Sequence, residues 1–224
     1  MVSINRSTLR RAAAALGATA LLSAALTPAA TAQENPLDAA RNIINQPGVP
    51  TEISDALNKG IGLINGLGNK GGDKKGGWEI PEDAPETNQF WVPTVSTKCI
   101  NGATPSFGLA TTVPGPAPLP LPGVGDGELG VIFTGLGTKG VAKQQNTEMK
   151  VYWVNVANGT YGADKLTYNN INPEGPGTIN TNVKTGKGLV VAVLQGGFTA
   201  DEASGPSDCN YSPTAGIFPV GVNK

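Results

Sequence analysis

The sequence predicts an all-β domain, a two-sheet sandwich of about seven or eight strands, preceded by a short helical arm and a flexible linker. From residue 88 onward, short runs rich in β-branched residues alternate with turn residues, as in packed antiparallel strands. Glycine and proline supply 31 and 18 of the 224 residues, well above the usual ~12% for the two together. The expected strands are 90–96, 106–113, 128–134, 150–157, 165–168, 178–183, 188–195 and 216–220.

Residues 1–32 have the organisation of an export signal. Three arginines precede an alanine- and leucine-rich run over 12–25, and Ala30-Thr31-Ala32 has the small-x-small pattern of a cleavage site. The apolar run is shorter than the ~20 residues that span a bilayer. We therefore expect cleavage between Ala32 and Gln33, no transmembrane span in the mature chain, and a secreted or cell-envelope location. The paired arginines leave open whether export is general or twin-arginine.

Charge divides the mature chain into unequal parts. Without the leader it carries thirteen basic and seventeen acidic residues, a net charge of −4. Residues 33–87 hold nine of the acidic and five of the basic groups, whereas residues 88–224 hold eight of each. We assign 33–67 to a weakly helical arm, 68–87 to a glycine-rich and acidic linker, and 88–224 to the β-sandwich domain. This balance provides no basic surface for nucleic acid.

The arm has apolar residues at helical spacing. Those expected on one face are Leu37, Ala40, Ile43, Ile44, Ile53, Leu57, Ile61 and Ile64. Gly60, Gly62 and Gly66 each weaken a helix by up to ~1 kcal/mol relative to alanine. The arm therefore needs a surface to pack against, and its own domain, a second copy of the chain and an envelope component are the alternatives.

Cys99 and Cys209 are the only cysteines, and both follow the export signal. An even number of cysteines in an exported chain predicts a disulfide. This bond would join the beginning of the β domain to its end and would contribute up to roughly 4–5 kcal/mol by the loop-entropy model. Because no C-x-x-C spacing is present, we expect a structural disulfide rather than a redox pair.

Two local patterns predict connections between strands. Asn158-Gly159 directly follows an expected strand and indicates a tight hairpin. Proline occupies every second position over 114–122, which favours polyproline II over a sheet strand. We expect this segment to be a rigid crossover between the two sheets, with an exposed apolar arm as the alternative.

Residues that could carry chemistry are few. The chain has no histidine, which excludes histidine-dependent triads and histidine-ligated zinc. The glycine motif over 135–140 follows an expected strand but precedes no helix, so it predicts a turn rather than a dinucleotide site. Glu174, Asp201 and Glu202 are conceivable carboxylates for glycoside-type hydrolysis, and Asp201, Glu202 and Asp208 are conceivable calcium ligands. We nevertheless expect no catalytic residue, no metal site and no cofactor.

A resemblance to a known group rests on the leader and on two stretches. The stretches are VYWVNVANGTYG (151–162) and CNYSPTAGIFPV (209–220). With the arginine-containing, alanine-rich leader, they resemble secreted immunoglobulin-like β-sandwich proteins of mycolic-acid-containing actinobacteria. The resemblance covers roughly residues 88–224 and implies an immunoglobulin-like sandwich outside the cytoplasm.

These observations favour a secreted or envelope-associated protein that binds or supports other components without catalysis. Its expected partner is an envelope component or another protein, contacted through the helical arm. The alternative is a carrier of an apolar ligand such as an envelope lipid, because aliphatic residues far outnumber aromatic ones. A carboxylate-dependent hydrolase is the third and least favoured hypothesis.

Overall fold

The computed structural model describes residues 35–68, 88–91, 93–120 and 122–221. The export signal, the Ala32–Gln33 cleavage position and the linker after Gly68 lie outside the described residues. All structural statements below therefore concern the arm and the β domain.

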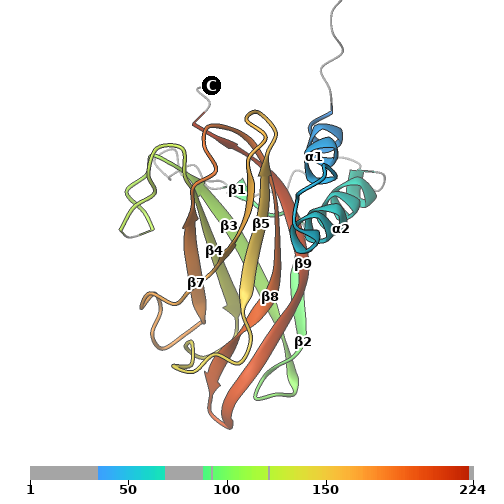
Figure 1. Ribbon diagram of the computed structural model, residues 1–224. Coiled ribbons are helices and arrows are strands. Elements are labelled where there is room, and N and C mark those ends of the chain that lie inside the picture. The colour runs from blue at the N-terminus through green and yellow to red at the C-terminus, as the bar shows by residue number, and fades with distance from the viewer. Residues whose placement is uncertain (1–34, 69–87, 92, 121, 222–224) are drawn as a thin grey trace, which may run out of the picture. The chain divides into compact units, whose positions relative to one another are not determined.

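The β domain consists of two antiparallel sheets packed face to face (Figure 1). The first sheet has the order β1-β3-β4-β7, and β2 also pairs with β3 along the same edge as β1. Its strands are β1 (Asn88–Gln89), β2 (Thr94–Ile100), β3 (Thr104–Pro114), β4 (Leu129–Leu136) and β7 (Thr178–Val183). The second sheet has the order β6-β5-β8-β9. Its strands are β5 (Met149–Asn155), β6 (Tyr161–Lys165), β8 (Gly188–Glu202) and β9 (Gly205–Val220). The predicted two-sheet sandwich is confirmed.

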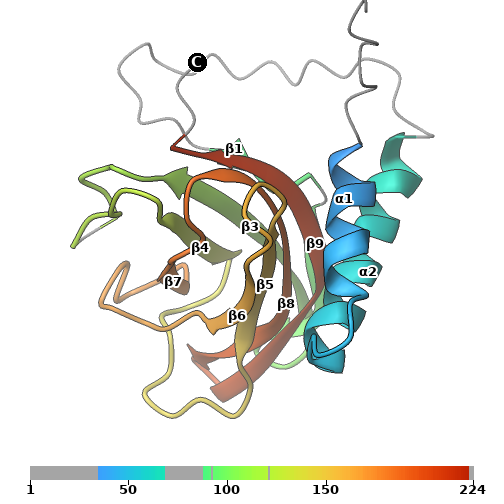
Figure 2. The same cartoon turned by 45° about the horizontal axis from the view of Figure 1, so that its top comes forward.

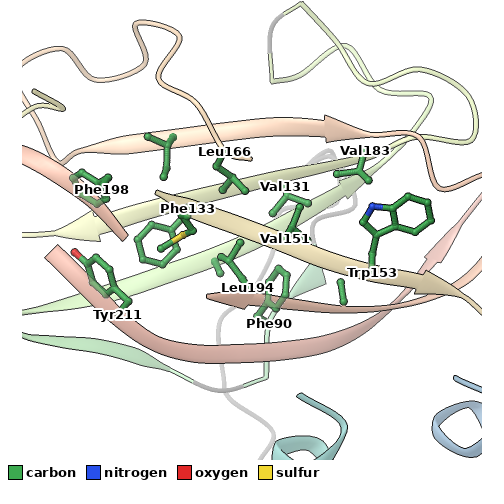
Figure 3. Close-up of a cluster of buried hydrophobic side chains, with 14 of the residues drawn as sticks. Phe90, Val131, Phe133, Val151, Trp153, Leu166, Val183, Leu194, Phe198 and Tyr211 are labelled. Atoms are coloured by element: carbon green, nitrogen blue, oxygen red, sulfur yellow. The ribbon is translucent and has the colours of Figure 1, made fainter. Parts of the chain in front are cut away.

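The main core lies between the sheets (Figure 3). Val131 and Phe133 of β4 face Val151 of β5 and Leu194 of β8, and all four are at most 1% exposed. Strand alternation places every second residue on this inner side. Burial of each such side chain contributes ~1.5–3 kcal/mol relative to exposure, so this layer holds the two sheets together.

The predicted disulfide is confirmed and joins the two sheets along one edge. Cys99 of β2 and Cys209 of β9 are fully buried, with their Cα atoms 4.5 Å apart. Hydrogen bonds lie on both sides of this bond along the edge. The Ser207 hydroxyl donates to the Cys99 carbonyl at 2.5 Å, and the Trp91 amide donates to the Ala215 carbonyl at 3.0 Å. The β2–β9 edge is thus closed by covalent and polar contacts together.

The arm forms the helices α1 (Pro36–Ile44) and α2 (Thr51–Gly68), as its periodicity predicts. The Asn35 side chain caps α1 by accepting from the Leu37 amide at 3.0 Å. Both helices lie against the outer side of the second sheet, near β9 (Figure 2). Their buried apolar residues are Leu37, Ala40, Ile44, Ala56, Leu57, Ile61 and Ile64, and the sheet contributes Tyr152, Val154, Val191, Val193 and Ala215. The sequence left three surfaces open for the arm: its own domain, a second copy and an envelope component. In the structure, the apolar side of the arm packs against its own domain.

No helix among the described residues is long and apolar enough to span a membrane.

A chain of ion pairs connects α2 to the second sheet. Glu52 accepts from the Tyr152 hydroxyl at 2.6 Å and from Lys150 at 3.0 Å. Lys150 also contacts Glu148 at 3.3 Å, and Glu148 contacts Lys165 at 3.0 Å. The Tyr152 and Lys150 hydrogen bonds hold the pKa of Glu52 below its ordinary value.

This contact makes the attachment of α2 sensitive to acid. Because the folded-state pKa of Glu52 is lowered, its stabilising contribution is present above the ordinary pKa of 4.5 and is lost as the pH falls through the lower folded value. We expect Glu52→Gln to lower the melting temperature at neutral pH, and we expect this difference to shrink as the pH falls below 4.5. Melting curves of both proteins across pH would measure it. Asp55→Asn, an exposed carboxylate on the same helix, is the control for helix charge. A difference that persists unchanged in acid would contradict the assignment.

Strand bounds depart from the predictions at both ends of the β domain, and the predicted strand 90–96 is replaced by β1 (Asn88–Gln89) and β2 (Thr94–Ile100). β7 has the predicted bounds, but β8 extends to Glu202 rather than 195, and β9 begins at Gly205 rather than 216. A register shift between Leu194 and Gly196 introduces a bulge, after which the two strands continue to pair. Gly196-Gly197 and Pro213 therefore interrupt the sequence pattern without ending the strands. β6 likewise occupies 161–165 instead of the predicted 165–168.

The prediction that residues 114–122 cross between the sheets is wrong. β3 and β4 are neighbours in one sheet, with Pro114 opposite Leu129, so the segment connects a hairpin. The Ala117 and Val124 backbones exchange hydrogen bonds of 2.9 and 2.8 Å. Ala117 stands between two prolines and retains its amide, so the segment can fold back on itself. The alternative of an exposed apolar arm agrees with Leu119, which is 52% exposed.

Candidate functional site

A cavity of about 300 Å³ opens between the two sheets beside β6 and β7. We call it the inter-sheet cavity. It is lined by the 141–147 connection, the beginning of β5, the end of β6 with the residues that follow it, and parts of β7 and β8. Its apolar lining residues are Val141, Ala142, Met149, Leu166, Tyr168, Ile179 and Phe198.

The floor of the cavity belongs to the main core. Met149, Leu166, Ile179 and Phe198 are each at most 3% exposed. Leu166 and Phe198 point into the space between the sheets in Figure 3. Because these side chains come from both sheets, the cavity is the place where the packed interior meets solvent.

Charged side chains stand at the opening. Lys165 is paired with Glu148 at 3.0 Å, and hydrogen bonds from Lys165 and Lys150 lower the pKa of Glu148. Lys143 also lines the cavity and is exposed. Within the described part of the chain, no carboxylate lies within ion-pair distance of Lys143. Its ammonium group is therefore available to an anion at the opening.

Gln145 makes several of the hydrogen bonds that hold the 141–147 wall in place. Gln145 donates to the carbonyls of Ala142 and Thr199 at 2.8 and 2.9 Å, and it accepts from the Thr199 amide at 2.8 Å. Val141 forms an isolated bridge with Ala200 of β8. These contacts fix the wall to the second sheet, so the cavity is preformed rather than assembled from a free loop.

The three carboxylates considered for hydrolysis do not lie together in the structure. Asp201 and Glu202 are neighbours on β8, so their side chains lie on opposite sides of the strand, one exposed and one buried. Glu202 accepts from the Lys139 amide at 2.9 Å. Glu174 is exposed in the connection between β6 and β7. None of the three lines the inter-sheet cavity.

Two of the three candidate calcium ligands, Glu202 and Asp208, have other partners. Asp208 accepts from the Thr199 hydroxyl at 2.7 Å and from the Asn146 amide group at 3.3 Å. Over the residues that the structure describes, no group of three or more cysteine, aspartate or glutamate side chains is placed to hold a metal ion. The network around Asp208 instead fastens the 141–147 connection to the β8–β9 hairpin.

The glycine motif over 135–140 forms a turn. Gly137 has a φ of 83°, and the Thr138 amide donates to the Gly135 carbonyl at 3.3 Å. No helix follows the motif, since the next elements are the 141–147 connection and β5. The geometry matches the predicted turn and offers no helix N-terminus for a pyrophosphate.

The buried side chain of Tyr211, near the disulfide, contributes to packing. Tyr211 packs edge-on against Phe133 and stacks with Phe198, and its hydroxyl lies 2.8 Å from the Ser106 hydroxyl. Burial raises the pKa of Tyr211 to about 12. The phenol is therefore neutral at physiological pH and is not available as a base.

Sequence inspection identified the disulfide but missed the inter-sheet cavity. The lining residues come from four separate stretches of the sequence, and Leu166, Ile179 and Phe198 have the same character as any core residue. The one sequence feature that pointed to the cavity wall was the polar stretch 143–147 between two expected strands.

A scan of protein-family models and searches of curated proteins and solved structures find no match to this chain.

Proposed function

We propose that this chain is an exported, non-enzymatic binding protein and that the inter-sheet cavity is its ligand site. The observation that carries the proposal is a preformed cavity with an apolar floor and, at its opening, a lysine without an ion-pair partner among the described residues. Small-molecule sites are typically concave and mostly apolar, with a few polar groups that orient the ligand. The export signal and the buried disulfide support a location outside the cytoplasm.

The lining suggests the chemical class of the ligand. An aliphatic or aromatic body would contact Met149, Leu166 and Phe198, and an acidic group would pair with Lys143. The volume of about 300 Å³ is at the small end of the usual range of ligand pockets, about 300–1,000 Å³. A small amphipathic acid, or one chain of a lipid, therefore fits better than a complete two-chain lipid.

The other hypotheses have weaker support. A role for the arm in docking a partner would use its polar side, because its apolar side packs on the second sheet. A hydrolase of this type would need two carboxylates facing the same substrate. Asp201 and Glu202 are consecutive residues of β8, and their side chains lie on opposite sides of the strand.

A fluorescent fatty acid tests the proposal directly. We expect a dansyl-labelled undecanoic acid to bind the purified protein with an increase in fluorescence. Filling the cavity by Ala142→Phe should weaken binding about tenfold or more. Lys143→Glu should also weaken binding of the acid, but it should have little effect on the uncharged methyl ester.

Matched variants separate the cavity from general effects. Ala163→Phe enlarges an exposed alanine on β6 outside the cavity, and Lys184→Glu changes an exposed lysine beyond the opposite end of β7. Both should bind the probe as the unaltered protein does. Equal binding by Ala142→Phe and Ala163→Phe, with melting temperatures unchanged, would contradict the proposal.

A further inference from the structure

A second hollow, of about 630 Å³, lies beside the 141–147 connection, next to the inter-sheet cavity. We call it the outer hollow. Its lining residues are Ala142, Lys143, Gln144, Asn146, Asp201 and Pro206. Ala142 and Lys143 line the inter-sheet cavity as well, so the two spaces are neighbours at these residues. A ligand whose acidic group pairs with Lys143 would therefore have this group at the edge of the outer hollow.

The outer hollow holds two charges of opposite sign that have no partner among the described residues. Lys143 and Asp201 are both exposed, and no described group forms an ion pair or a hydrogen bond with either side chain. An anion alone in the hollow would be attracted by Lys143 and repelled by Asp201, and a cation alone would meet the reverse. Only a group that carries both charges is complementary to both side chains.

Hydrogen bonds between backbone groups fix the positions from which the two charges project. The Ala142 amide donates to the Thr199 carbonyl at 2.9 Å, and the Asp201 amide donates to the Gly140 carbonyl at 2.8 Å. These bonds hold the beginning of the connection antiparallel to the end of β8, which itself pairs with β9. Because both backbones are fixed in this way, the outer hollow is preformed, like the inter-sheet cavity beside it.

We propose that the outer hollow binds the head group of the ligand and that this head group is zwitterionic. The inference rests on the proposed function, because the apolar part of the same ligand would occupy the inter-sheet cavity. The acidic group pairs with Lys143 where the two spaces meet, and an ammonium group farther along the head pairs with Asp201. The side-chain amides of Gln144 and Asn146 can donate to oxygen atoms of the head. The ligand class is thus a single-chain amphiphile whose head contains an acid and an ammonium group.

Three amphiphiles with the same dodecyl chain test the proposal. Dodecylphosphocholine carries both charges, dodecyl methyl phosphate only the acid, and dodecyltrimethylammonium only the cation. Isothermal titration of the purified protein at low ionic strength, below the concentrations at which micelles form, measures each affinity. We expect dodecylphosphocholine to bind about three- to fivefold more tightly than either of the others, since an ion pair at an exposed position contributes modestly.

A matched pair of variants assigns this preference to the outer hollow. Asp201→Asn should abolish the preference for dodecylphosphocholine over dodecyl methyl phosphate, because the amide no longer attracts the ammonium group. Asp55→Asn makes the same change at an exposed position of α2 that lines neither the inter-sheet cavity nor the outer hollow. It should leave the preference unchanged.

The other outcomes separate this inference from the proposed function. Equal binding of dodecylphosphocholine and dodecyl methyl phosphate, or a preference that Asp201→Asn leaves in place, would overturn the zwitterionic head group while the inter-sheet cavity remained a ligand site. Binding of L-phenylalanine, which has both charged groups on one carbon atom and no chain, would assign the site to a free amino acid instead. If neither the dansyl-labelled acid nor any dodecyl compound binds, the proposed function fails and the inference fails with it.

Discussion

Replacing Cys99 and Cys209 together by alanine is expected to lower the free energy of unfolding by about 4 kcal/mol. The bond closes a loop between residues 110 apart, so its removal releases a large amount of chain entropy in the unfolded state. Because a domain of this kind is stabilised by only about 5–15 kcal/mol, the change removes a large share of the total. Urea unfolding of both proteins would measure the difference as a shift in the midpoint.

The hydrogen bonds along the same edge provide the control. Ser207→Ala removes the hydroxyl that donates to the Cys99 carbonyl and leaves the disulfide intact. It should cost about 1 kcal/mol, as expected for one buried hydrogen bond. If the double alanine variant were no less stable than Ser207→Ala, the β2–β9 edge would depend on its polar contacts rather than on the disulfide.

Gly60→Ala is expected to destabilise the protein, although alanine is the better helix former. A Cβ atom at position 60 would collide with the Val193 side chain and lie 3.2 Å from the Ala215 Cβ atom. Val193 is fully buried and β-branched, so it cannot rotate away freely and α2 must move outward. Overpacking costs ~1–3 kcal/mol, which exceeds the gain in helix propensity of up to ~1 kcal/mol. Thermal and urea unfolding would measure the net loss.

Gly62→Ala is the matched variant two residues away. A Cβ atom there would meet nothing within 4 Å outside the neighbouring backbone of its own helix, so only the helix propensity changes. We expect stabilisation by up to ~1 kcal/mol, opposite in sign to Gly60→Ala. Effects of the same sign at both positions would show that α2 does not rest on β8 and β9 as described.

The apolar spacing of the arm predicted its helices and their apolar side, but not the surface that covers this side. Leu37, Leu57 and Ile61 were expected on one helix face, and each is buried against the second sheet. Their spacing required a helix with an apolar side. It carried no information on which surface would cover that side, because a sheet, a second copy and a foreign partner all bury the same residues.

The long β8–β9 hairpin shows where local patterns fail. Gly196, Gly197 and Pro213 resemble strand ends in sequence, yet pairing continues past all three. The bulge after Leu194 absorbs the irregularity, and pairing with β8 and the disulfide at Cys209 hold the first part of β9 in place. Tertiary contacts therefore overrode local propensity at these positions.

The sequence by itself determined the class of the fold, the disulfide pairing and the presence of two helices. Each follows from local alternation, from helical spacing or from there being only two cysteines to pair. Only the tertiary structure decided that the arm covers the second sheet, that the proline-rich segment closes a hairpin, and that a cavity opens beside Leu166 and Phe198. Those features depend on which distant residues meet, and a core residue has the same composition whether it lines a cavity or fills one.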